Sequence, residues 1–539
     1  MKILKAISII LLSYLTTGCG APAPRGDHRA TSHYHEPFRP QFHFSPDSMW
    51  TNDPNGLVFF EGEYHLFYQY HPYDIVWGPM HWGHAVSRDL VRWTHLPVAL
   101  YPDTLGMIFS GCAVVDRNNT SGLGDRNVPP LVAVFTYHNE RLREKGSNRF
   151  QYQGIAFSPD KGRSWTKFGG NPVLQNPGIS DFRDPKVIWY EKEMKWVMTL
   201  AAHDRVLFYS SPDLVEWTGT GEFTDELVPS SAVWECPDLF PLNPGGEEKW
   251  VLIVNVSSGG PNGGSGTLYF AGSFDGSTFR DENLPPGPRW IDYGKDNYAG
   301  VTWSGIPSQD GRRIFLGWMS NWQYADRVPT QHWRGAMTLP RELELVRLNG
   351  NYRLYSRPVS ELKLLRQSAT EISGQTFGDT IDPEGITGLN PSQFEMDMAF
   401  ECLSEGPSGK AEGSSGTAEA PGLAAGFGIA LANDLNQQLL IGYDRISGQV
   451  YVDRTNAGVT SFSEHFPGRH TAPFQPENDE IRFHIFVDRS SVELFLNRGA
   501  LVMTEIVFPE GGFTQIRLYA SGGPATLKEG TIYNLEGIW

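Results

Sequence analysis

Residues 156–165 read AFSPDKGRSW, and this stretch decides the fold because the chain repeats its pattern. A strand runs into a Ser-x-Asp turn, and an aromatic residue then opens the next strand. The same pattern occurs at 85–93 (AVSRDLVRW), 209–217 (YSSPDLVEW) and 271–279 (AGSFDGSTF). Ser and Asp side chains bond to their own backbone in such turns. The copies follow one another at about 50 to 70 residues, which suits four-stranded propeller blades with inserted loops. The repeat therefore predicts a β-propeller.

The composition supports a folded, β-rich protein. The 539 residues include 58 Gly and 38 Pro, with 13% aromatic and only 19% charged residues. These values argue against a disordered, collagenous or coiled-coil chain. One hydrophobic core stops growing near about 250–300 residues, so we expect at least two domains. The net charge is −17 and no basic stripe is present, so the electrostatic attraction that drives nucleic-acid binding is missing.

The first residues read as a targeting segment. Lys2 and Lys5 precede the apolar run 7–15, which is shorter than the ~20 residues that span a bilayer but suits a secretory signal peptide. Cys19 follows Gly18 as in a bacterial lipoprotein cleavage box, although Leu15 lies four residues before the cysteine instead of three. We therefore expect lipidation at Cys19 and an exported, membrane-anchored lipoprotein, periplasmic or on the cell surface. The alternative is an ordinary signal peptide with an incidental cysteine.

The sequence pattern changes near Pro340, and we expect a domain boundary after it. Alternating strands such as 481–487 and 492–496 predict a C-terminal β-sandwich. The expected layout is a signal peptide (1–18), a tether (19–40), a propeller (41–348), a linker with a short helix (349–372) and a sandwich (373–539). We expect 403–421, which is rich in Gly, Ser, Ala and Glu, to be a flexible inserted loop. Cys112, Cys236 and Cys402 lack disulfide or metal spacing and are expected to be small buried hydrophobes.

Three acidic motifs carry the candidate chemistry. They are 50–56 (WTNDPNG), 182–186 (FRDPK) and 234–238 (WECPD). Each acid precedes or begins an apolar strand. Taken singly, each acid suits a turn or cap, but equivalent positions on successive blades converge on the propeller axis, so the three could share one pocket. Clustered carboxyl groups push their pKa values apart, which lets one stay protonated while another is ionised. Glycoside hydrolysis needs that division.

These motifs, in this order, resemble those of glycoside hydrolase family 32, whose members include invertases, levanases and inulinases. The resemblance extends through 109–111 (FSG), 317–322 (GWMSNW), 333–341 (WRGAMTLPR) and 487–493 (VDRSSVE), and so covers about residues 41–539. Thr51, where Met is usual, and Cys112, where Ser is common, depart from the pattern without removing an acid. The resemblance implies an all-β protein with a five-bladed propeller followed by a β-sandwich, and a retaining mechanism on β-linked fructosyl units.

The resemblance also implies the roles of individual residues. Asp53 is expected to be the nucleophile, Glu235 the general acid/base and Asp184 the stabiliser of the transition state. Positions that match the sugar pocket of the family are Asn52, Gln69, Trp77, Phe109, Ser110, Arg183 and Trp322. No metal or organic cofactor is implied. The expected substrates are fructans (levan, inulin) and sucrose, cut by release of terminal fructose. An endo-acting levanase is the alternative, and a non-catalytic fructan-binding protein is a more distant one.

Two further classes compete on the same fold. The stretch 158–165 also resembles the Asp-box turn of sialidases, but the arginine set and Tyr nucleophile of those enzymes are not recognisable here. An inverting glycosidase would hold its carboxyl groups farther apart to admit water. The sandwich carries no acidic motif that we can interpret, so we expect it to serve packing or a subunit contact.

Overall fold

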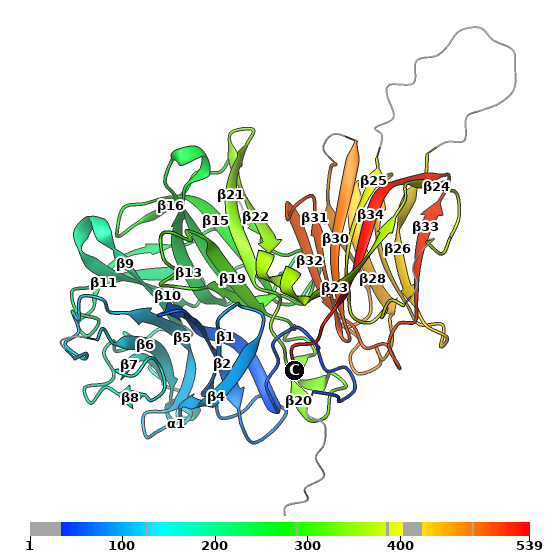
Figure 1. Cartoon of the computed structure of the whole chain (residues 1–539). Helices are drawn as coiled ribbons and strands as arrows, with labels where there is room; N and C mark the ends of the chain where they lie inside the picture. Colours follow the sequence, from blue (N-terminus) through cyan, green and yellow to red (C-terminus); the bar gives the residue numbers. More distant parts are fainter. Residues whose placement is uncertain (1–33, 126–127, 286–288, 384–387, 403–422, 477–478) are drawn as a thin grey trace, which may run out of the picture.

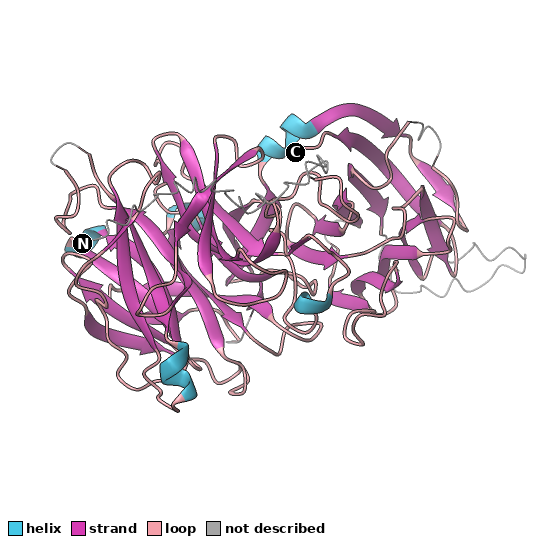
Figure 2. Ribbon diagram, turned by 90° about the horizontal axis from the view of Figure 1, so that it is seen from below, coloured by secondary structure: helices cyan, strands magenta, loops and turns pink. Residues whose placement is uncertain are grey.

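The computed structural model describes residues 34–539 except 126–127, 286–288, 384–387, 403–422 and 477–478. Within these residues the chain forms two β-rich bodies, a propeller and a sandwich, that lie beside each other (Figure 1). The few helices are short (Figure 2): α1 (Glu140–Glu144) and the 3₁₀ turns η1 (Glu191–Glu193), η2 (Pro244–Gly246), η3 (Ala325–Arg327) and η4 (Ser360–Leu365). The predicted fold class is confirmed. The expected signal peptide, Cys19 and the 403–421 loop lie outside the described residues.

Five sheets form the propeller within the described part of the chain. Blade 1 holds β1 (Met49–Phe60), β2 (Glu63–His71), β3 (His81–Ser87) and β4 (Trp93–Leu100), and β20 (Trp333–Arg334) pairs parallel to β1. Blade 2 holds β5 (Met107–Val115), β6 (Leu131–His138), β7 (Gln151–Ser158) and β8 (Thr166–Lys167). Blade 3 holds β9 (Phe182–Tyr190), β10 (Lys195–Ala202), β11 (Val206–Ser211) and β12 (Thr218–Phe223).

The last two blades complete the ring. Blade 4 holds β13 (Trp234–Leu242), β14 (Lys249–Val256), β15 (Gly266–Phe274), β16 (Phe279–Asp281) and β17 (Arg289–Trp290). Blade 5 holds β18 (Tyr298–Thr302), β19 (Arg313–Trp318), β21 (Arg341–Leu348) and β22 (Asn351–Pro358). The first strands contact one another in the closed order β1, β5, β9, β13, β18 and back to β1. These five strands therefore surround the axis.

The repeated turn lies between the third and fourth strands of blades 1 to 4. Ser158 Oγ donates to Asp160 Oδ1 at 2.8 Å, and the serine–aspartate pairs at 87/89 and 211/213 make the same bond at 3.0 and 3.2 Å. In blade 4 the hydroxyl that donates to Asp275 comes from Ser277, which follows the aspartate, and the carboxylate also accepts the backbone N–H groups of Ser277 and Thr278. The predicted turn is confirmed, and its function is to join strands within a blade.

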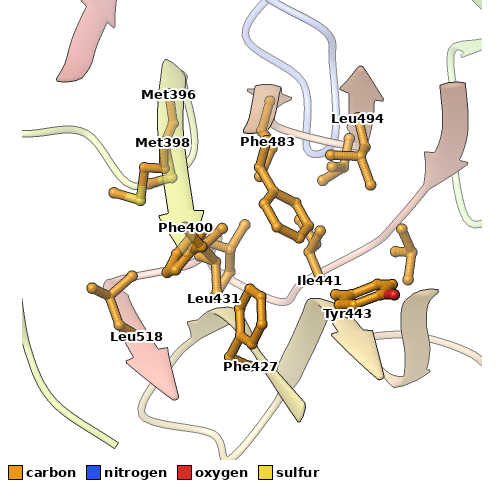
Figure 3. Packing of buried hydrophobic residues seen from close by; sticks show 14 of the residues in the cluster. Met396, Met398, Phe400, Phe427, Leu431, Ile441, Tyr443, Phe483, Leu494 and Leu518 are labelled. Carbon is orange, nitrogen blue, oxygen red and sulfur yellow. The ribbon is translucent and has the colours of Figure 1, made fainter. Parts of the chain in front are cut away.

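The sandwich consists of two further sheets. One contains β23 (Arg366–Ile372), β24 (Gln375–Phe377), β25 (Phe394–Glu401), β30 (Glu480–Asp488), β31 (Ser491–Leu496), β32 (Leu501–Ile506) and β34 (Ala525–Leu535). The other contains β26 (Gly426–Ala432), β27 (Gln438–Asp444), β28 (Gln449–Asn456), β29 (Arg469–Pro473) and β33 (Gln515–Ser521). Alternate residues such as Met396, Met398 and Phe400 face Ile441, Leu518 and other apolar side chains between the sheets (Figure 3). The period-2 pattern of the sequence produces this core.

Buried charges join the two bodies. The Asp488 carboxylate accepts the backbone N–H groups of Gln41, Phe42 and His43, and the His43 ring lies 2.9 Å from Asp488 and 3.0 Å from Glu493. Glu493 also accepts from Arg341 of β21 at 2.6 Å. Burial opposes protonation of His43, but hydrogen bonds to the two carboxylates outweigh it and raise the pKa of His43 to about 9. The 487–493 motif of the sandwich therefore binds the propeller through these buried contacts.

Segments at the domain borders also pack closely. Tyr34, at the start of the described chain, stacks on Trp539 with ring centroids 4.1 Å apart, and Arg39 is fully buried. Between the bodies, η4 lies within the expected linker 349–372 and buries Leu362 and Leu365, while β22 of blade 5 and β23 of the sandwich occupy the flanking parts of that range. The three described cysteines are free and buried, as predicted. No helix in the described ranges has the length and apolar character that a membrane crossing requires.

Candidate active site

The three acidic motifs lie on three of the five innermost strands. Asp53 belongs to β1, Asp184 to β9 and Glu235 to β13. In each motif a proline follows the acid by one or two residues. Proline cannot donate to a ladder hydrogen bond and is therefore found at bulges.

The strand registers show those irregularities next to each acid. The pairing of β1 shifts between Thr51 and Pro54, and that of β13 shifts between Glu235 and Asp238. The pairing of β9 with β10 shifts between Arg183 and Lys186, which lie opposite Ala201 and Thr199. Asp184 adopts φ 67° and Cys236 φ 42°, which is uncommon for non-glycine residues. The irregular backbone lets each acidic side chain reach the pocket at the axis.

One pocket of about 390 Å³ collects these groups. Its lining includes the three acids and every predicted sugar-pocket residue, namely Asn52, Gln69, Trp77, Phe109, Ser110, Arg183 and Trp322. It also includes six residues that the sequence did not single out: His138, Glu140, Arg143, Phe150, Gln151 and Asp181. The structure thus brings together all predicted site residues except Cys19, which lies outside the described residues.

Asp53 is held from both sides. Ser110 Oγ donates to its Oδ2 at 2.6 Å, and Asn52 Nδ2 donates to its Oδ1 at 2.9 Å. The indole N–H of Trp50 donates to Asn52 Oδ1 at 2.7 Å and thereby orients that amide. The Cys236 thiol lies 3.7 Å from Asp53 Oδ2. These contacts hold the Asp53 carboxyl group in one orientation.

Glu235 accepts hydrogen bonds from an arginine and a tyrosine. Arg183 donates to Glu235 Oε1 from Nη2 at 2.8 Å and from Nε at 3.2 Å. The Tyr298 hydroxyl of β18 donates to Oε2. Arg183 also pairs with Asp181. The side chain of Glu235 is thus oriented while it stays in contact with the pocket.

Asp184 is the most enclosed of the three acids. Its Oδ2 accepts the backbone N–H of Cys236 at 3.1 Å and lies 3.8 Å from Arg183 Nε. Its own backbone N–H donates to Thr136 Oγ1 at 2.9 Å. Bonds to β6 and β13 thus hold a residue of β9.

Burial perturbs the titration of this cluster. Desolvation, together with the negative charges of Glu235 and Asp53, raises the pKa of Asp184 to about 7 against the opposing effect of Arg183. Desolvation also raises the pKa of Glu235, again opposed by Arg183. Asp184 and Glu235 share one close arginine, which also pairs with Asp181, so this pair of carboxyl groups retains a proton at a pH where free carboxyl groups are ionised. Such a cluster can perform acid/base chemistry.

Aromatic rings form two walls of the pocket. On one side Trp77 meets Phe109 edge-on at 6.0 Å, and Phe109 stacks on His138 at 4.3 Å between ring centroids. On the other side Trp322 packs against Trp318 at 4.8 Å. Trp77 and Trp322 are 42% and 36% exposed, so they lie at the mouth of the pocket. Aromatic walls with few polar groups between them are typical of small-molecule sites.

The six additional residues come chiefly from blade 2. Gln151 accepts from Arg183 at 3.5 Å and donates to His138 Nδ1 at 3.2 Å, and the Nε2–H of His138 faces Glu140 at 3.0 Å. Burial lowers the pKa of His138, so the ring is neutral and its Nδ1 can accept. A polar chain therefore leads from Arg183 to the rim. These residues lie in no motif, so the sequence carried no signal for them.

Comparisons with known proteins cover both the propeller and the sandwich. Residues 43–358 match the model of the glycosyl hydrolases family 32 N-terminal domain, and 361–534 match that of the family 32 C terminal. A levanase of Bacillus subtilis (strain 168) is 48% identical over 514 residues, which covers 94% of this chain and 72% of that protein.

Two fungal comparisons add to this agreement. An extracellular exo-inulinase of Aspergillus awamori is 36% identical over 537 residues, with 94% of this chain and 96% of that protein covered. Among solved structures, the exo-inulinase crystal structure from Aspergillus awamori superposes with a TM-score of 0.83 at 34% identity. The match covers 94% of this chain and all of that one.

Proposed function

The chain belongs to glycosyl hydrolase family 32, and from this premise we propose that it is a retaining β-fructosidase that releases terminal fructose from fructans and sucrose. The observation that carries the proposal is the meeting of Asp53, Asp184 and Glu235, from three different blades, in one pocket. The names of the relatives, levanase and exo-inulinase, support the substrate class.

In this proposal Asp53 attacks the anomeric carbon of the terminal fructose. Its Oδ2 forms a bond to that carbon while the bond to the leaving oxygen breaks, and the product is a covalent fructosyl-enzyme. Ser110 and Asn52 keep the carboxylate in one rotamer, so little reorganisation is needed before attack.

Glu235 supplies the proton for the leaving oxygen. In the second step the Glu235 carboxylate takes a proton from water while the water oxygen bonds to the anomeric carbon and the bond from that carbon to Asp53 breaks. Hydroxyl groups of a bound fructose can donate to Asp184, which favours the ionised form of Asp184 and leaves the shared proton on Glu235. Asp184 then binds the hydroxyls more tightly as the furanose ring flattens, which stabilises the transition state.

A single assay tests the function. Purified protein should hydrolyse sucrose, levan or inulin, and NMR of the first product should show retention of the anomeric configuration. Inversion would contradict the covalent intermediate. Fructan binding without any hydrolysis would support a non-catalytic binding protein instead.

We expect cleavage from the non-reducing end. The pocket is bounded by Trp77 and Trp322 and admits a chain end more readily than the middle of a chain. Chromatography of the earliest levan and inulin digests should therefore show fructose alone. A ladder of fructo-oligosaccharides with little monomer at the start would favour the endo-acting alternative.

We also propose that the protein is exported and anchored through a lipid on Cys19. The relative from Aspergillus awamori is named as extracellular. A diacylglyceryl group with an amide-linked chain holds a membrane more firmly than a single acyl chain. The wild-type protein should sediment with membranes and be released by detergent, whereas C19A should be soluble. An equal membrane fraction for both proteins would disprove lipidation.

A further inference from the structure

We propose that an aromatic strip on blade 1, formed by Tyr73, His81 and Tyr101, binds the distal units of a fructan whose terminal unit occupies the pocket. The inference rests on the proposed function and extends it beyond the pocket. Tyr73 is 69% exposed and Tyr101 is 53% exposed. Large exposed aromatic side chains grouped on one surface indicate a contact site for a ligand or partner.

The strip is a contiguous set of rings. The Tyr73 and His81 ring centroids lie 5.6 Å apart, and those of His81 and Tyr101 lie 5.5 Å apart. Both pairs meet edge-on, at 78° and 82°. His81 is buried, and its Nδ1 lies 2.8 Å from the carbonyl oxygen of Pro79. The histidine thus acts as a fixed spacer between two exposed tyrosines.

The strand register places the strip on the same face as the pocket. Thr51, two residues before Asp53 in the 50–56 motif, pairs with Tyr70, and Tyr70 pairs with His81. In the sheet order β1-β2-β3-β4, Tyr73 follows β2 and Tyr101 follows β4. The strip therefore runs outward from the axis across the pocket end of the blade.

The loop that carries Tyr73 also carries Trp77 and is firmly anchored. The Trp50 backbone N–H donates to the carbonyl oxygen of Asp74 at 3.1 Å, and His71 Nδ1 lies 2.8 Å from that of Val76. Gly78 lies flat on the His71 ring, where a Cβ atom would come within 2.4 Å of the ring. The loop that carries Tyr73 and Trp77 is thus fixed before any ligand arrives, which lowers the entropic cost of binding.

The aromatic character of the strip and its position beside the pocket indicate that its ligand is a fructan chain. Trp77 lines the pocket and shares its loop with Tyr73, so the strip continues the predicted substrate site. A fructan chain must leave the pocket through its mouth, and its furanose units present C–H faces to aromatic rings while their hydroxyls remain hydrated. Sucrose has a single unit beyond its fructose, so it offers the strip fewer units than a fructan chain does.

Kinetics on long and short substrates test the strip. Tyr73→Ala and Tyr101→Ala should each lower the ratio of kcat/KM for levan or inulin to kcat/KM for sucrose by about threefold, and the double variant by about tenfold, through KM. Tyr73→Phe, which keeps the ring, should retain the wild-type ratio. Leu435→Ala is the matched control, because Leu435 is 60% exposed on the sandwich. An unchanged ratio for both polymers in the double variant would overturn the proposal.

A binding measurement separates this inference from the proposed function. In the Asp53→Asn background, migration through a gel containing levan or inulin should be retarded, and the double tyrosine replacement should remove most of the retardation. If the wild-type protein hydrolyses no fructoside, the proposed function fails, but the gel still tests the strip. Equal retardation with and without the tyrosines would reject the strip while leaving the catalytic proposal intact.

Discussion

Replacement of Asp53 by asparagine is expected to abolish turnover of sucrose and fructans, with a loss of at least about 10⁴-fold in kcat. An amide cannot form the fructosyl ester, whatever its position. Asparagine has nearly the shape of aspartate, and its side-chain oxygen can still accept from Ser110 or Asn52. The fold and the pocket should therefore survive, and the loss should appear in initial rates at saturating sucrose.

The control for this result is Asp382→Asn. The side chain of Asp382 is 81% exposed on the sandwich and pairs with Arg517, so the same chemical change should leave the rate unaltered. Both variants should keep the thermal unfolding midpoint of the wild-type protein within about 2 °C. Asp53→Asn with a rate within tenfold of wild type would refute the nucleophile assignment.

Replacement of Glu235 by alanine is expected to slow sucrose hydrolysis by about 10²–10⁴-fold, the usual contribution of a general acid/base. A fructoside with an activated leaving group needs no proton for the first step, so its fructosyl transfer should be much less impaired. Because the second step then lacks its base, the fructosyl-enzyme should accumulate. Mass spectrometry should find one fructosyl unit on the peptide that contains Asp53.

The pH profile gives an independent test of Glu235. A general acid must hold its proton, so kcat/KM for sucrose falls as the pH rises through the pKa of that acid. Burial raises the pKa of Glu235 above its ordinary value of 4.5, so the wild-type decline should lie above that pH. Glu235→Ala, assayed on the activated fructoside, should lose this alkaline decline.

Two results would contradict the acid/base assignment. One is an equal loss on sucrose and on the activated fructoside, and the other is an unchanged alkaline decline in Glu235→Ala. The matched control is Glu529→Ala, because the Glu529 side chain is 68% exposed on the sandwich and touches Arg482.

Much of this protein could be predicted from local sequence. The Ser-x-Asp turns bond within a few residues, as between Ser158 and Asp160, so their positions follow from neighbouring residues alone. The number of blades does not follow in this way. Blade 5 turns at Asn349 and Gly350 between β21 and β22 and lacks the repeat. Four blades were visible as repeats, and the fifth was implied only by the family resemblance.

The role of the 487–493 motif in the sandwich could not be predicted from local sequence. Asp488 and Glu493 had no interpretation in the sequence because His43, which contacts both, lies about 450 residues away along the chain. We expected a packing role for the sandwich. The structure defines that packing as the contact of β30 and β31 with the N-terminal segment that contains His43. Burial of these charges is stable because each one finds opposite charges or N–H donors.

The sequence by itself determined the repeated turns, many of the strands, the order of the acidic motifs and the motif residues that line the pocket. Only the tertiary structure decided that Gln151, His138 and Glu140 form a chain from Arg183 to the rim. It also decided that Tyr73 and Tyr101 both contact His81 at the end of blade 1 where Thr51 lies. The physical reason is the range of the interactions. Turns and strand periodicity depend on adjacent residues, whereas a pocket forms where strands distant in sequence close a ring, and loops without motifs are placed by that closure.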